Sequence, residues 1–325
     1  MIIVTGGAGF IGSALIWQLN QSGHKDILVV DDLGLEDKWQ NLVKRAIRDV
    51  VSIAEFPKYL KETKTPIEAI FHMGACSSTV EVDADYLMKN NVHYSMMLAE
   101  YATKNKIPFI YASSAATYGS EEKDFSDDES SLSSLRPINK YGYSKHLFDQ
   151  WLLNQSEKPP VWAGLKFFNV YGPCEYHKGS QASVAYHAFS QVRDTSTLKL
   201  FKSYREDIPH GEQKRDFVYV KDVVKICEHF MKLDDKQTSG IYNVGTGESR
   251  SFLDLLGAIG QAFDKKVDPV FIEMPEAIRE RYQYFTEADL TRLRQKARYE
   301  EPFTSLEEGV KDYYRAYLQK SDPYL

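Results

Sequence analysis

Two residues near the middle of the chain have the types and the spacing of an acid–base pair. Tyr141 and Lys145 stand four residues apart in YGYSK, so on a helix they lie one above the other on the same face. A free tyrosine has a pKa of about 10, and a nearby ammonium group favours the phenolate, which can take the proton of a hydroxyl group. Ser114 ends the run YASS and could hydrogen-bond the same hydroxyl oxygen. An ordinary amphipathic helix can carry the same spacing, so the pattern needs support from the rest of the chain.

A glycine-rich turn at the start of the chain provides that support. TGGAGFIG occupies residues 5–12, directly after the apolar run MIIVT and before the helical pattern IGSALIWQLNQSG. Gly6, Gly9 and Gly12 suit a tight turn, a close backbone approach to a pyrophosphate, and helix-to-strand packing. The helix that follows offers free N–H groups and the positive end of its dipole to phosphates. This context favours a dinucleotide site over a turn that is merely tight.

The charged residues after the second apolar run bear on which dinucleotide binds. Asp31 lies about twenty residues beyond the glycine turn, where an acid typically bonds the adenosine ribose hydroxyls, and this favours NAD. Asp32 adds negative charge and argues further against a 2′-phosphate. Lys38 could instead reach such a phosphate and admit NADP, or it could be a solvated helix residue. The residues alone leave the choice between NAD and NADP open.

The segments that carry these residues alternate in the manner of a parallel sheet with crossover helices. Expected strands cover residues 1–5, 27–31, 69–72, 109–113 and 161–168, and expected helices cover about 11–23, 84–104 and 141–153. A possible returning strand at 241–244 makes the two parts of the chain interleave. The predicted fold is α/β: a Rossmann-type doubly wound parallel sheet with a smaller C-terminal α/β substrate-binding lobe.

The same rhythm predicts two domains. Past Gly172 the chain breaks into loops, short strands and separate helices. We therefore expect a NAD(P)-binding Rossmann domain over residues 1–170, with returning segments at about 215–245, and a lobe over 171–325 that mainly binds substrate. That lobe would close over the carboxyl ends of the strands, where open α/β sheets bind ligands. The acidic, Ser-rich stretch 121–134 is expected to be a surface loop.

The composition excludes several classes of protein. With 43% hydrophobic and 26% charged residues, the chain is that of a folded globular protein. Its net charge of −6 gives no general basic surface, so we expect no nucleic-acid partner and no membrane partner. Three widely spaced cysteines fit neither a disulfide framework nor a zinc site, and no metal is expected. No apolar run reaches the roughly 18 residues of a membrane span, and no basic leader precedes the first strand. These features predict a cytoplasmic enzyme.

Five motifs together resemble the extended short-chain dehydrogenase/reductase superfamily, in its sugar-nucleotide branch. They are TGGAGFIG, YASSAATYG, YGYSK, FFNVYGP and RDFVYVKD, and they span about residues 1–225. Members of this branch bind NAD(P) in the N-terminal lobe and a nucleotide sugar beneath the C-terminal lobe. Its 4,6-dehydratases carry an Asp-Glu pair directly after the catalytic Ser or Thr, whereas this chain has Ala115 and Ala116. Because alanine cannot transfer a proton, dehydration is not expected.

Further motifs narrow the resemblance to the ADP-L-glycero-D-manno-heptose 6-epimerases of the NAD-dependent epimerase/dehydratase family. These motifs are HMGACSST, LMKNN, FFNVYGPCEYHKGSQASVAYH and RYQYFTEADL, and the similarity runs almost end to end. The resemblance implies an isomerase that acts on the ADP-heptose precursor of the lipopolysaccharide inner core, with one NADP per subunit. It also implies a homo-oligomer, namely a pentamer. Two features depart from the pattern: Met73 stands where the family often has Glu, and residues 204–213 look like an expanded loop.

The resemblance also implies a mechanism at C6″ of the heptose. Tyr141, as the phenolate, removes the C6″ hydroxyl proton while hydride leaves C6″ for the nicotinamide. The resulting 6-keto sugar must be reduced on its opposite face, and its exocyclic C6″ can turn without release of the nucleotide. The carbonyl oxygen then points away from Tyr141, so a second proton donor is useful. The resemblance implies Lys178 for that role, although Lys178 could also be a phosphate-binding or surface lysine.

The predicted site residues fall into three groups. The catalytic group is Tyr141, Lys178, Lys145 and Ser114. The expected cofactor contacts are Gly6, Gly9, Phe10, Ile11, Gly12, Asp31, Asp32, Lys38, Met73, Gly74, Ala75, Cys76, Ser77, Asn90, Tyr141, Lys145, Val170 and Lys178. The expected substrate contacts are Ser114, Asn169, Ser180, His187, Phe201, Lys202, Ser203, Tyr204, Arg215 and Tyr282.

Several expected substrate contacts have plainer explanations. Asn169 could cap a turn, and His187 could be a structural histidine that is satisfied internally. The Arg215 guanidinium could fork onto the substrate diphosphate. It could equally form a salt bridge with Asp216 or Asp222.

Two other functions are compatible with the same residues. A UDP-hexose 4-epimerase, or another sugar-nucleotide oxidoreductase of the branch, would use the same Ser, Tyr and Lys set. A non-catalytic NAD(P)-sensing regulator could keep the Rossmann domain without chemistry. Such a regulator need not preserve Tyr141, Lys145 and Ser114 together, and this favours an enzyme.

Overall fold

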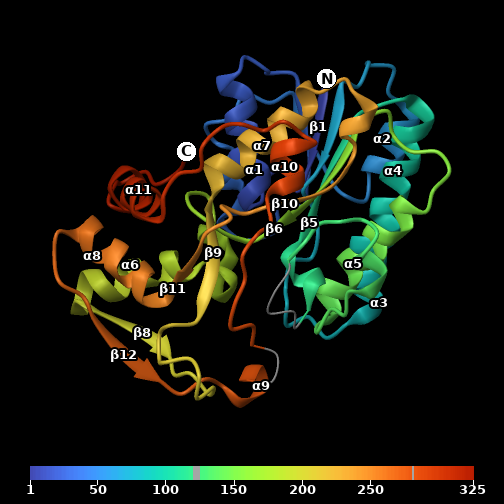
Figure 1. Ribbon diagram of the computed structural model, residues 1–325. Coiled ribbons are helices and arrows are strands. Elements are labelled where there is room, and N and C mark those ends of the chain that lie inside the picture. The colour runs from blue at the N-terminus through green and yellow to red at the C-terminus, as the bar shows by residue number, and fades with distance from the viewer. Residues whose placement is uncertain (120–124, 280–281) are drawn as a thin grey trace.

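A seven-stranded parallel sheet is the main element of the computed structural model, which describes residues 1–119, 125–279 and 282–325 (Figure 1). The strand order is β10-β6-β5-β4-β1-β2-β3, and every neighbouring pair is parallel. This order places β1 inside the sheet, between β4 and β2, as in dinucleotide-binding folds. The strands are β1 (Ile2–Thr5), β2 (Ile27–Val30), β3 (Asp49–Val51), β4 (Ala69–His72), β5 (Phe109–Ser114), β6 (Trp162–Phe167) and β10 (Gly240–Val244). The predicted fold class is confirmed.

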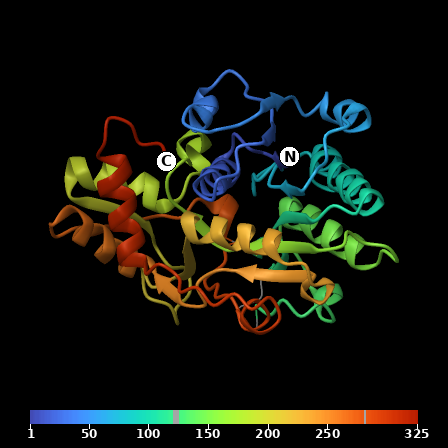
Figure 2. The ribbon, with the colours of Figure 1, turned by 90° about the horizontal axis from the view of Figure 1, so that it is seen from above.

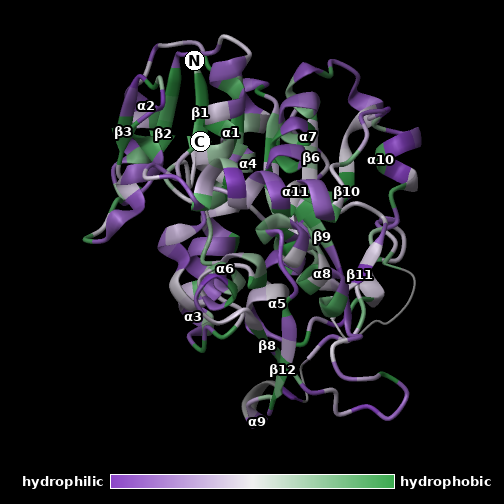
Figure 3. Cartoon of the chain, turned by 90° about the vertical axis from the view of Figure 1, so that its left-hand side faces the viewer, coloured by the Kyte–Doolittle hydropathy of each residue, from purple (hydrophilic) through white to green (hydrophobic). Residues whose placement is uncertain are grey.

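The sheet is covered on both faces, as parallel sheets usually are. Along β1, Ile2 and Val4 pack into one hydrophobic cluster, whereas Ile3 packs into another. Figure 1 shows the helices of the two layers on opposite sides of the sheet, and Figure 3 shows its strands in the green of apolar residues. The first layer is α1 (Phe10–Gln21) with α7 (Val220–Lys232), and the second is α2 (Phe56–Glu62), α4 (Tyr94–Asn105) and α5 (Lys140–Leu153).

The smaller lobe lies beyond the carboxyl ends of the strands, and its helices α6, α8 and α11 lie together in Figure 2. Two small sheets belong to it, in the orders β11-β9-β7 and β12-β8. Its strands are β7 (Asn169–Tyr171), β8 (Thr197–Phe201), β9 (Lys214–Tyr219), β11 (Ser249–Ser251) and β12 (Asp268–Ile272). Its helices are α6 (Val184–Thr195), α8 (Phe252–Phe263), α9 (Glu276–Arg279) and α11 (Leu306–Asp312), while α10 (Thr291–Gln295) packs on β10.

Three elements differ from the sequence expectation. The helix expected at 84–104 is α3 (Ala84–Leu87), a π-helical stretch at Met88–His93, and α4. The short strand β3 and the helix α2 were not predicted, because three residues and a proline-containing heptapeptide give weak periodic signals. Among the described residues, no helix is both long and apolar enough to cross a lipid bilayer.

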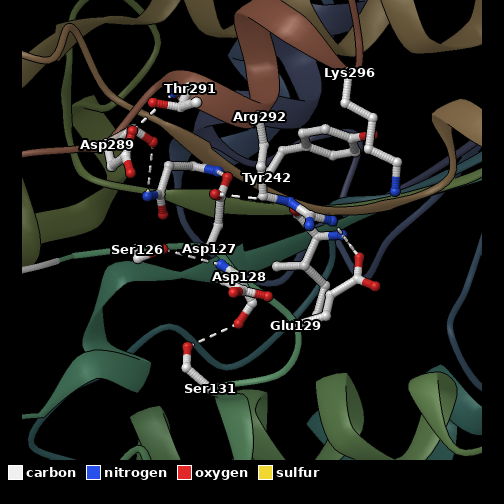
Figure 4. Close-up of polar contacts among 12 residues, drawn as sticks. Ser126, Asp127, Asp128, Glu129, Ser131, Tyr242, Asp289, Thr291, Arg292 and Lys296 are labelled. Carbon is white, nitrogen blue, oxygen red and sulfur yellow. Dashed lines mark hydrogen bonds and ion pairs between the residues drawn. The ribbon is translucent and has the colours of Figure 1, made fainter.

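The outer edge of β10 is capped by side chains instead of another strand (Figure 4). The backbone N–H of Ile241 donates to Glu129 Oε1 at 3.1 Å, and that of Asn243 donates to Asp127 Oδ2 at 2.7 Å. Two acids spaced two residues apart thus match two N–H groups of the strand with the same spacing. Arg292 Nε donates to the Ile241 carbonyl at 3.3 Å, and its guanidinium lies 2.5 Å from Glu129. The cap satisfies edge groups that would otherwise be free to pair with another chain.

This cap corrects the expectation of a surface loop at 121–134. Residues 121–124 lie outside the described residues. In the remainder, Phe125 and Leu132 are buried in the core, and Asp127 is only 1% exposed. Asp127 and Glu129 point towards the edge of β10 because its N–H groups are donors for their carboxylates, whereas Asp128 is exposed.

Candidate active site

A cavity of about 750 Å³ opens at the carboxyl ends of the strands of the large sheet. Open α/β sheets bind ligands at this edge, and the volume is that of a typical ligand site. All of the predicted cofactor contacts line the cavity. Of the predicted substrate contacts, Ser114 and Asn169 line it as well. The structure therefore brings together residues from eight separate parts of the chain that the motifs had singled out.

The glycine turn has the shape that a pyrophosphate needs. A Cβ on Gly12 would lie 2.1 Å from the Gly6 carbonyl oxygen, and a Cβ on Gly6 would lie 2.5 Å from the Gly74 Cα. Gly6 also has a φ of +65°, which favours glycine. A Cβ on Gly9, by contrast, would meet only the Gly6 carbonyl, at 3.1 Å. Gly6 and Gly12 are therefore packed tightly against backbone atoms on the side away from the cavity, while Gly9 and the start of α1 face the cavity. These residues fit a bound dinucleotide.

Asp31 and Lys38 form an ion pair at the end of β2. Lys38 Nζ lies 2.6 Å from Asp31 Oδ1 and donates to the Asp32 carbonyl at 3.0 Å. The other Asp31 oxygen accepts the backbone N–H of Ala8 at 2.9 Å. Both acceptors of Asp31 are thus engaged, and Lys38 offsets its charge where the adenosine ribose is expected.

Asn91 connects Cys76, a predicted cofactor contact, to the catalytic helix α5, and the sequence did not reveal this role. Its side chain accepts from the backbone N–H of Cys76 at 2.9 Å and donates to the carbonyl of Cys76 at 2.9 Å. The same amide donates to Ser144 Oγ at 3.0 Å, and Ser144 donates to the carbonyl of Tyr141 at 2.7 Å. The only sequence signal was a polar residue on the buried face of an expected helix. The predicted contact, Asn90, lines the cavity and donates to a backbone carbonyl.

The catalytic residues lie where β5 ends and α5 begins. Asn139 caps α5 by accepting from the Gly142 N–H at 2.7 Å, and this fixes the start of the helix. Ser114 ends β5, its hydroxyl accepts from the Ala116 N–H at 3.1 Å, and it lines the cavity together with Tyr141. Lys145, one turn further along α5, donates to the carbonyl of Ala112 at 2.8 Å.

The electrostatics of this group depend mainly on burial. Burial raises the pKa of Tyr141 above its usual range, although the hydrogen bond from Ser114 acts in the opposite direction. Burial also lowers the pKa of Lys145 to about 8, while the charge of Asp149 opposes that change. Burial is therefore the largest influence on the pKa of Tyr141. That Lys145 and the positive nicotinamide ring together favour the phenolate stays a prediction.

Behind the catalytic helix lies a buried ion pair that the sequence did not predict. Asp149 follows Lys145 by four residues on α5 and is fully buried. It accepts from the Tyr111 hydroxyl at 2.9 Å and from Ser113 Oγ at 2.7 Å. Lys166 Nζ, on β6, lies 3.5 Å from the same carboxylate and is also fully buried. This pair connects α5 to two strands of the sheet directly behind the predicted proton donor.

Lys178 reaches the cavity from a different part of the chain. It lies on the 3-10 stretch η5 (Tyr176–Gln181), between β7 and α6. Its Nζ is 5.4 Å from the centroid of the Phe10 ring, at the start of α1. Burial lowers the pKa of Lys178, and the charge of Glu175 acts against that change. Two groups that can exchange protons, Tyr141 and Lys178, therefore line one cavity.

The comparison with family models decides the family. Residues 2–245 match the model of the NAD dependent epimerase/dehydratase family. The chain belongs to this family. The resemblance drawn from the motifs is confirmed at that level, and the cofactor is a nicotinamide dinucleotide.

Individual relatives show which members of the family the chain is similar to. A protein of Fusobacterium nucleatum subsp. nucleatum named ADP-L-glycero-D-manno-heptose-6-epimerase is 53% identical, and the match covers 100% of both chains. The crystal structure of the Helicobacter pylori ADP-L-glycero-D-manno-heptose-6-epimerase has a TM-score of 0.81 at 29% identity, covering 97% of this chain and 95% of that one. A UDP-glucose 4-epimerase from Thermotoga maritima, solved with UDP-glucose, has a TM-score of 0.77 at 27% identity, covering 97% and 98%.

Three predicted substrate contacts form a cluster beside the cavity, outside its lining. The Tyr282 ring packs edge-on against Phe201 with centroids 6.4 Å apart, and the Arg215 guanidinium lies 5.0 Å from the centroid of Tyr282. Arg215 is buried and donates to the carbonyls of Lys214 and Gln283. The alternative of a salt bridge with Asp216 is not what the structure contains, because Asp216 accepts backbone N–H groups of the turn after β10.

The remaining predicted substrate contacts lie farther from the chemistry. Ser203 and Tyr204 line a second, open pocket of about 530 Å³ in the smaller lobe. Lys202 is paired with Glu273 at 2.6 Å. Ser180 is exposed at the end of η5, and His187 lies on α6, while their neighbours Gln181, Ser183 and Val184 line the main cavity. Their contact with a substrate stays a prediction.

Two lining residues near the end of the chain were missed. Gln283 donates to the carbonyl of Gly119 at 2.7 Å, and the Thr286 hydroxyl donates to Asn169 Oδ1 at 3.4 Å. Both line the cavity and lie within the motif RYQYFTEADL, from which Tyr282 alone had been selected. Tyr282 was selected because its side chain is aromatic, whereas its polar neighbours Gln283 and Thr286 line the cavity. Among the described residues, no three His, Cys, Asp or Glu side chains gather as metal ligands.

Proposed function

We propose that this protein epimerises C6″ of ADP-D-glycero-D-manno-heptose to give ADP-L-glycero-D-manno-heptose, with one NADP bound per subunit. Tyr141 belongs to the predicted cofactor domain and Lys178 to the predicted substrate-binding lobe, and both line one cavity. This observation carries the proposal. An epimerase whose keto oxygen turns away from the first base has a use for a second proton-transfer group, whereas a simple dehydrogenase uses one. The full-length relative at 53% identity bears the name of this activity.

The first step uses the residues at the end of β5. When bound, the nicotinamide accepts hydride from C6″ and later returns it. Tyr141 takes the proton of the C6″ hydroxyl, and Ser114 hydrogen-bonds the same oxygen. Because burial raises the pKa of Tyr141, the phenolate requires added positive charge nearby, which the oxidised ring carries. Lys145, held against the Ala112 carbonyl at 2.8 Å, supplies a second positive charge one helical turn away.

The second step uses the loop between β7 and α6. Once the exocyclic carbon has turned, the carbonyl oxygen faces away from Tyr141. Lys178 then donates a proton to that oxygen as C6″ regains its hydrogen and electron pair. Burial lowers the pKa of Lys178, which makes its ammonium group a better proton donor. The product differs from the substrate only in configuration at C6″.

The ion pair at the end of β2 supports NADP over NAD. The Lys38 ammonium lies 2.6 Å from Asp31 and lines the cavity, so it both offsets the acid and offers a donor to a 2′-phosphate. In this assignment residues 1–170, with the returning segments at about 215–245, form the cofactor domain, although β9 within those segments pairs with strands of the smaller lobe. The lobe over 171–325 mainly binds the sugar nucleotide.

Incubation with two substrates tests the proposal. Purified protein is given ADP-D-glycero-D-manno-heptose or UDP-galactose, and the sugar signals are followed by proton NMR. We expect conversion of the ADP-heptose alone, and we expect Tyr141→Phe to abolish it. Turnover of UDP-galactose alone would instead assign the protein to the 4-epimerases of the same branch.

A further inference from the structure

The loop that carries Lys178 has little regular structure of its own. It runs from Gly172, directly after β7, to Ser183, the N-cap of α6. Within it the helical stretch η5 is interrupted at Gly179, whose φ is +53°. The backbone N–H of Lys178 donates to the carbonyl of Glu175 at 3.0 Å. A lysine on such a loop needs an anchor if its ammonium group is to stay at one place in the cavity.

Glu175 provides an anchor that joins both ends of this loop. Its carboxylate accepts from the Gly172 N–H at 3.1 Å. It also accepts from the Ser183 N–H at 2.5 Å and from Ser183 Oγ at 2.8 Å. Glu175 is 0% exposed, so these bonds are made away from water. One side chain therefore fixes the first and the last residue of the segment on which Lys178 stands.

The hydrogen-bond pattern suits a carboxylate and not an amide. The backbone N–H groups of Gly172 and Ser183 are donors only, and they meet different oxygens of Glu175. In a glutamine, the NH₂ group would face one of these N–H groups and leave a buried donor unpaired. A shorter aspartate would keep the charge but could not reach both ends of the loop.

Several titratable groups surround Glu175 and Lys178. Burial raises the pKa of Glu175, while its bonds to Ser183 and Gly172 and the charge of Lys178 lower it. On the other side, burial lowers the pKa of His177 to about 4, and the charges of Lys38 and Lys178 act in the same direction. Tyr313, from the stretch after α11, also faces Glu175. In this setting Glu175 is the acid whose charge favours the ammonium form of Lys178.

We propose that Glu175 is the positioning residue for the second proton donor: its carboxylate ties Gly172 to Ser183 and thereby holds Lys178 at the cavity. The inference rests on the role given to Lys178 in the proposed function. Glu175 itself does not line the cavity and acts only through Lys178.

Glu175→Gln tests this inference with two readouts. The first is kcat and KM for the ADP-heptose, and we expect kcat to fall about 10- to 100-fold with KM nearly unchanged, because a misplaced proton donor slows the chemistry. The second is the pH dependence with which an amine-acylating reagent labels Lys178 in the cofactor-free protein, followed by peptide mass spectrometry. We expect the labelling curve to move to lower pH by about one unit, because a favourable negative charge is removed.

Asp222→Asn is the matched control. Asp222 is also a buried carboxylate that accepts a backbone N–H, that of Thr304 at 2.7 Å, and it does not line the cavity. It should leave kcat and the labelling curve of Lys178 unchanged. A Glu175→Gln protein with the kcat and labelling curve of the parent would overturn the proposal. If that variant fails to fold, Glu175→Asp decides: we expect a lower kcat with the labelling curve kept, and an unchanged kcat overturns the idea.

Lys178→Met separates this inference from the proposed function. If Lys178→Met epimerises the ADP-heptose at the normal rate, the assignment of Lys178 as second proton donor fails, whatever Glu175 does. If Lys178→Met is inactive but Glu175→Gln behaves like the parent protein, only the positioning role of Glu175 fails.

Discussion

Replacing Lys166 by methionine would leave a charged carboxylate buried behind the catalytic helix. Asp149 and Lys166 are both fully buried, with 3.5 Å between the carboxylate oxygen and the ammonium nitrogen. Removing one partner of a buried ion pair typically costs about 3–5 kcal/mol, since the remaining charge is uncompensated. We expect Lys166→Met to lower the free energy of unfolding by an amount in this range.

The surrounding contacts place the cost within that range. Asp149 would keep the hydrogen bonds from Tyr111 at 2.9 Å and Ser113 at 2.7 Å, and these stabilise its charge. Lys166 would lose its bond to Thr117 Oγ1 at 2.5 Å and its contact with the Tyr118 ring, whose centroid lies 4.6 Å away. The hydrogen bonds that Asp149 keeps favour the lower end of the expected loss, about 3 kcal/mol. The contacts that Lys166 loses add about 1 kcal/mol.

A double-mutant cycle isolates the pair. Lys166→Met, Asp149→Asn and the double variant are unfolded in urea and followed by tryptophan fluorescence. Because the double variant removes both charges, its destabilisation should be smaller than the sum of the single ones by about 1–3 kcal/mol. Additive effects, or a loss below about 1 kcal/mol in Lys166→Met, would show that the pair does not stabilise the sheet against α5 and would refute this reasoning.

Three further predictions concern the cofactor turn and the edge cap. Gly12→Ala should abolish cofactor binding measured by isothermal titration, because its Cβ would lie 2.1 Å from the Gly6 carbonyl oxygen, whereas Gly257→Ala, with no atom within 4 Å, should bind normally. Lys38→Ala should weaken NADP binding about tenfold and leave NAD binding nearly unchanged, as expected for the loss of one charge-assisted contact to phosphate; an equal effect on both cofactors would contradict the role of Lys38. Burial raises the pKa of Asp127 from 3.8 to about 6, so the folded state holds this proton more tightly than the unfolded state, and stability from this group falls as pH rises from about 4 to 6. Asp127→Asn should remove up to about 3 kcal/mol of that pH dependence in the free energy of unfolding, and parallel pH curves for the two proteins would refute it.

The parts of the site that follow from local sequence were predictable. The glycine turn was found because Gly6, Gly9 and Gly12 come directly after an apolar strand, and the turn needs only neighbouring residues to form. The positions of Tyr141 and Lys145 followed from helical spacing in the same way. These signals lie within a few residues of one another, so periodicity and turn chemistry reveal them.

The contacts that sequence reasoning missed join distant residues. The cap on β10 joins Asp127 to the N–H of Asn243, 116 residues away, so nothing near Asp127 marks it as buried. The role of Glu175 depends on where Ser183 returns after the loop, and its sequence signal is only an acid near a lysine. The burial that raises the pKa of Tyr141 could not be predicted either, because helical spacing shows which charge is near, whereas the whole fold sets the degree of burial.

The fate of the hydrogen on C6″ tests the central claim most directly. ADP-D-glycero-D-manno-heptose carrying deuterium at C6″ is converted in ordinary water, and the product is analysed by NMR and mass spectrometry. If C6″ is oxidised and reduced again within one enclosed cavity, the ADP-L-glycero-D-manno-heptose should retain the deuterium at C6″. A product that has lost the label and carries solvent hydrogen there would contradict transient oxidation at C6″ with a bound nicotinamide.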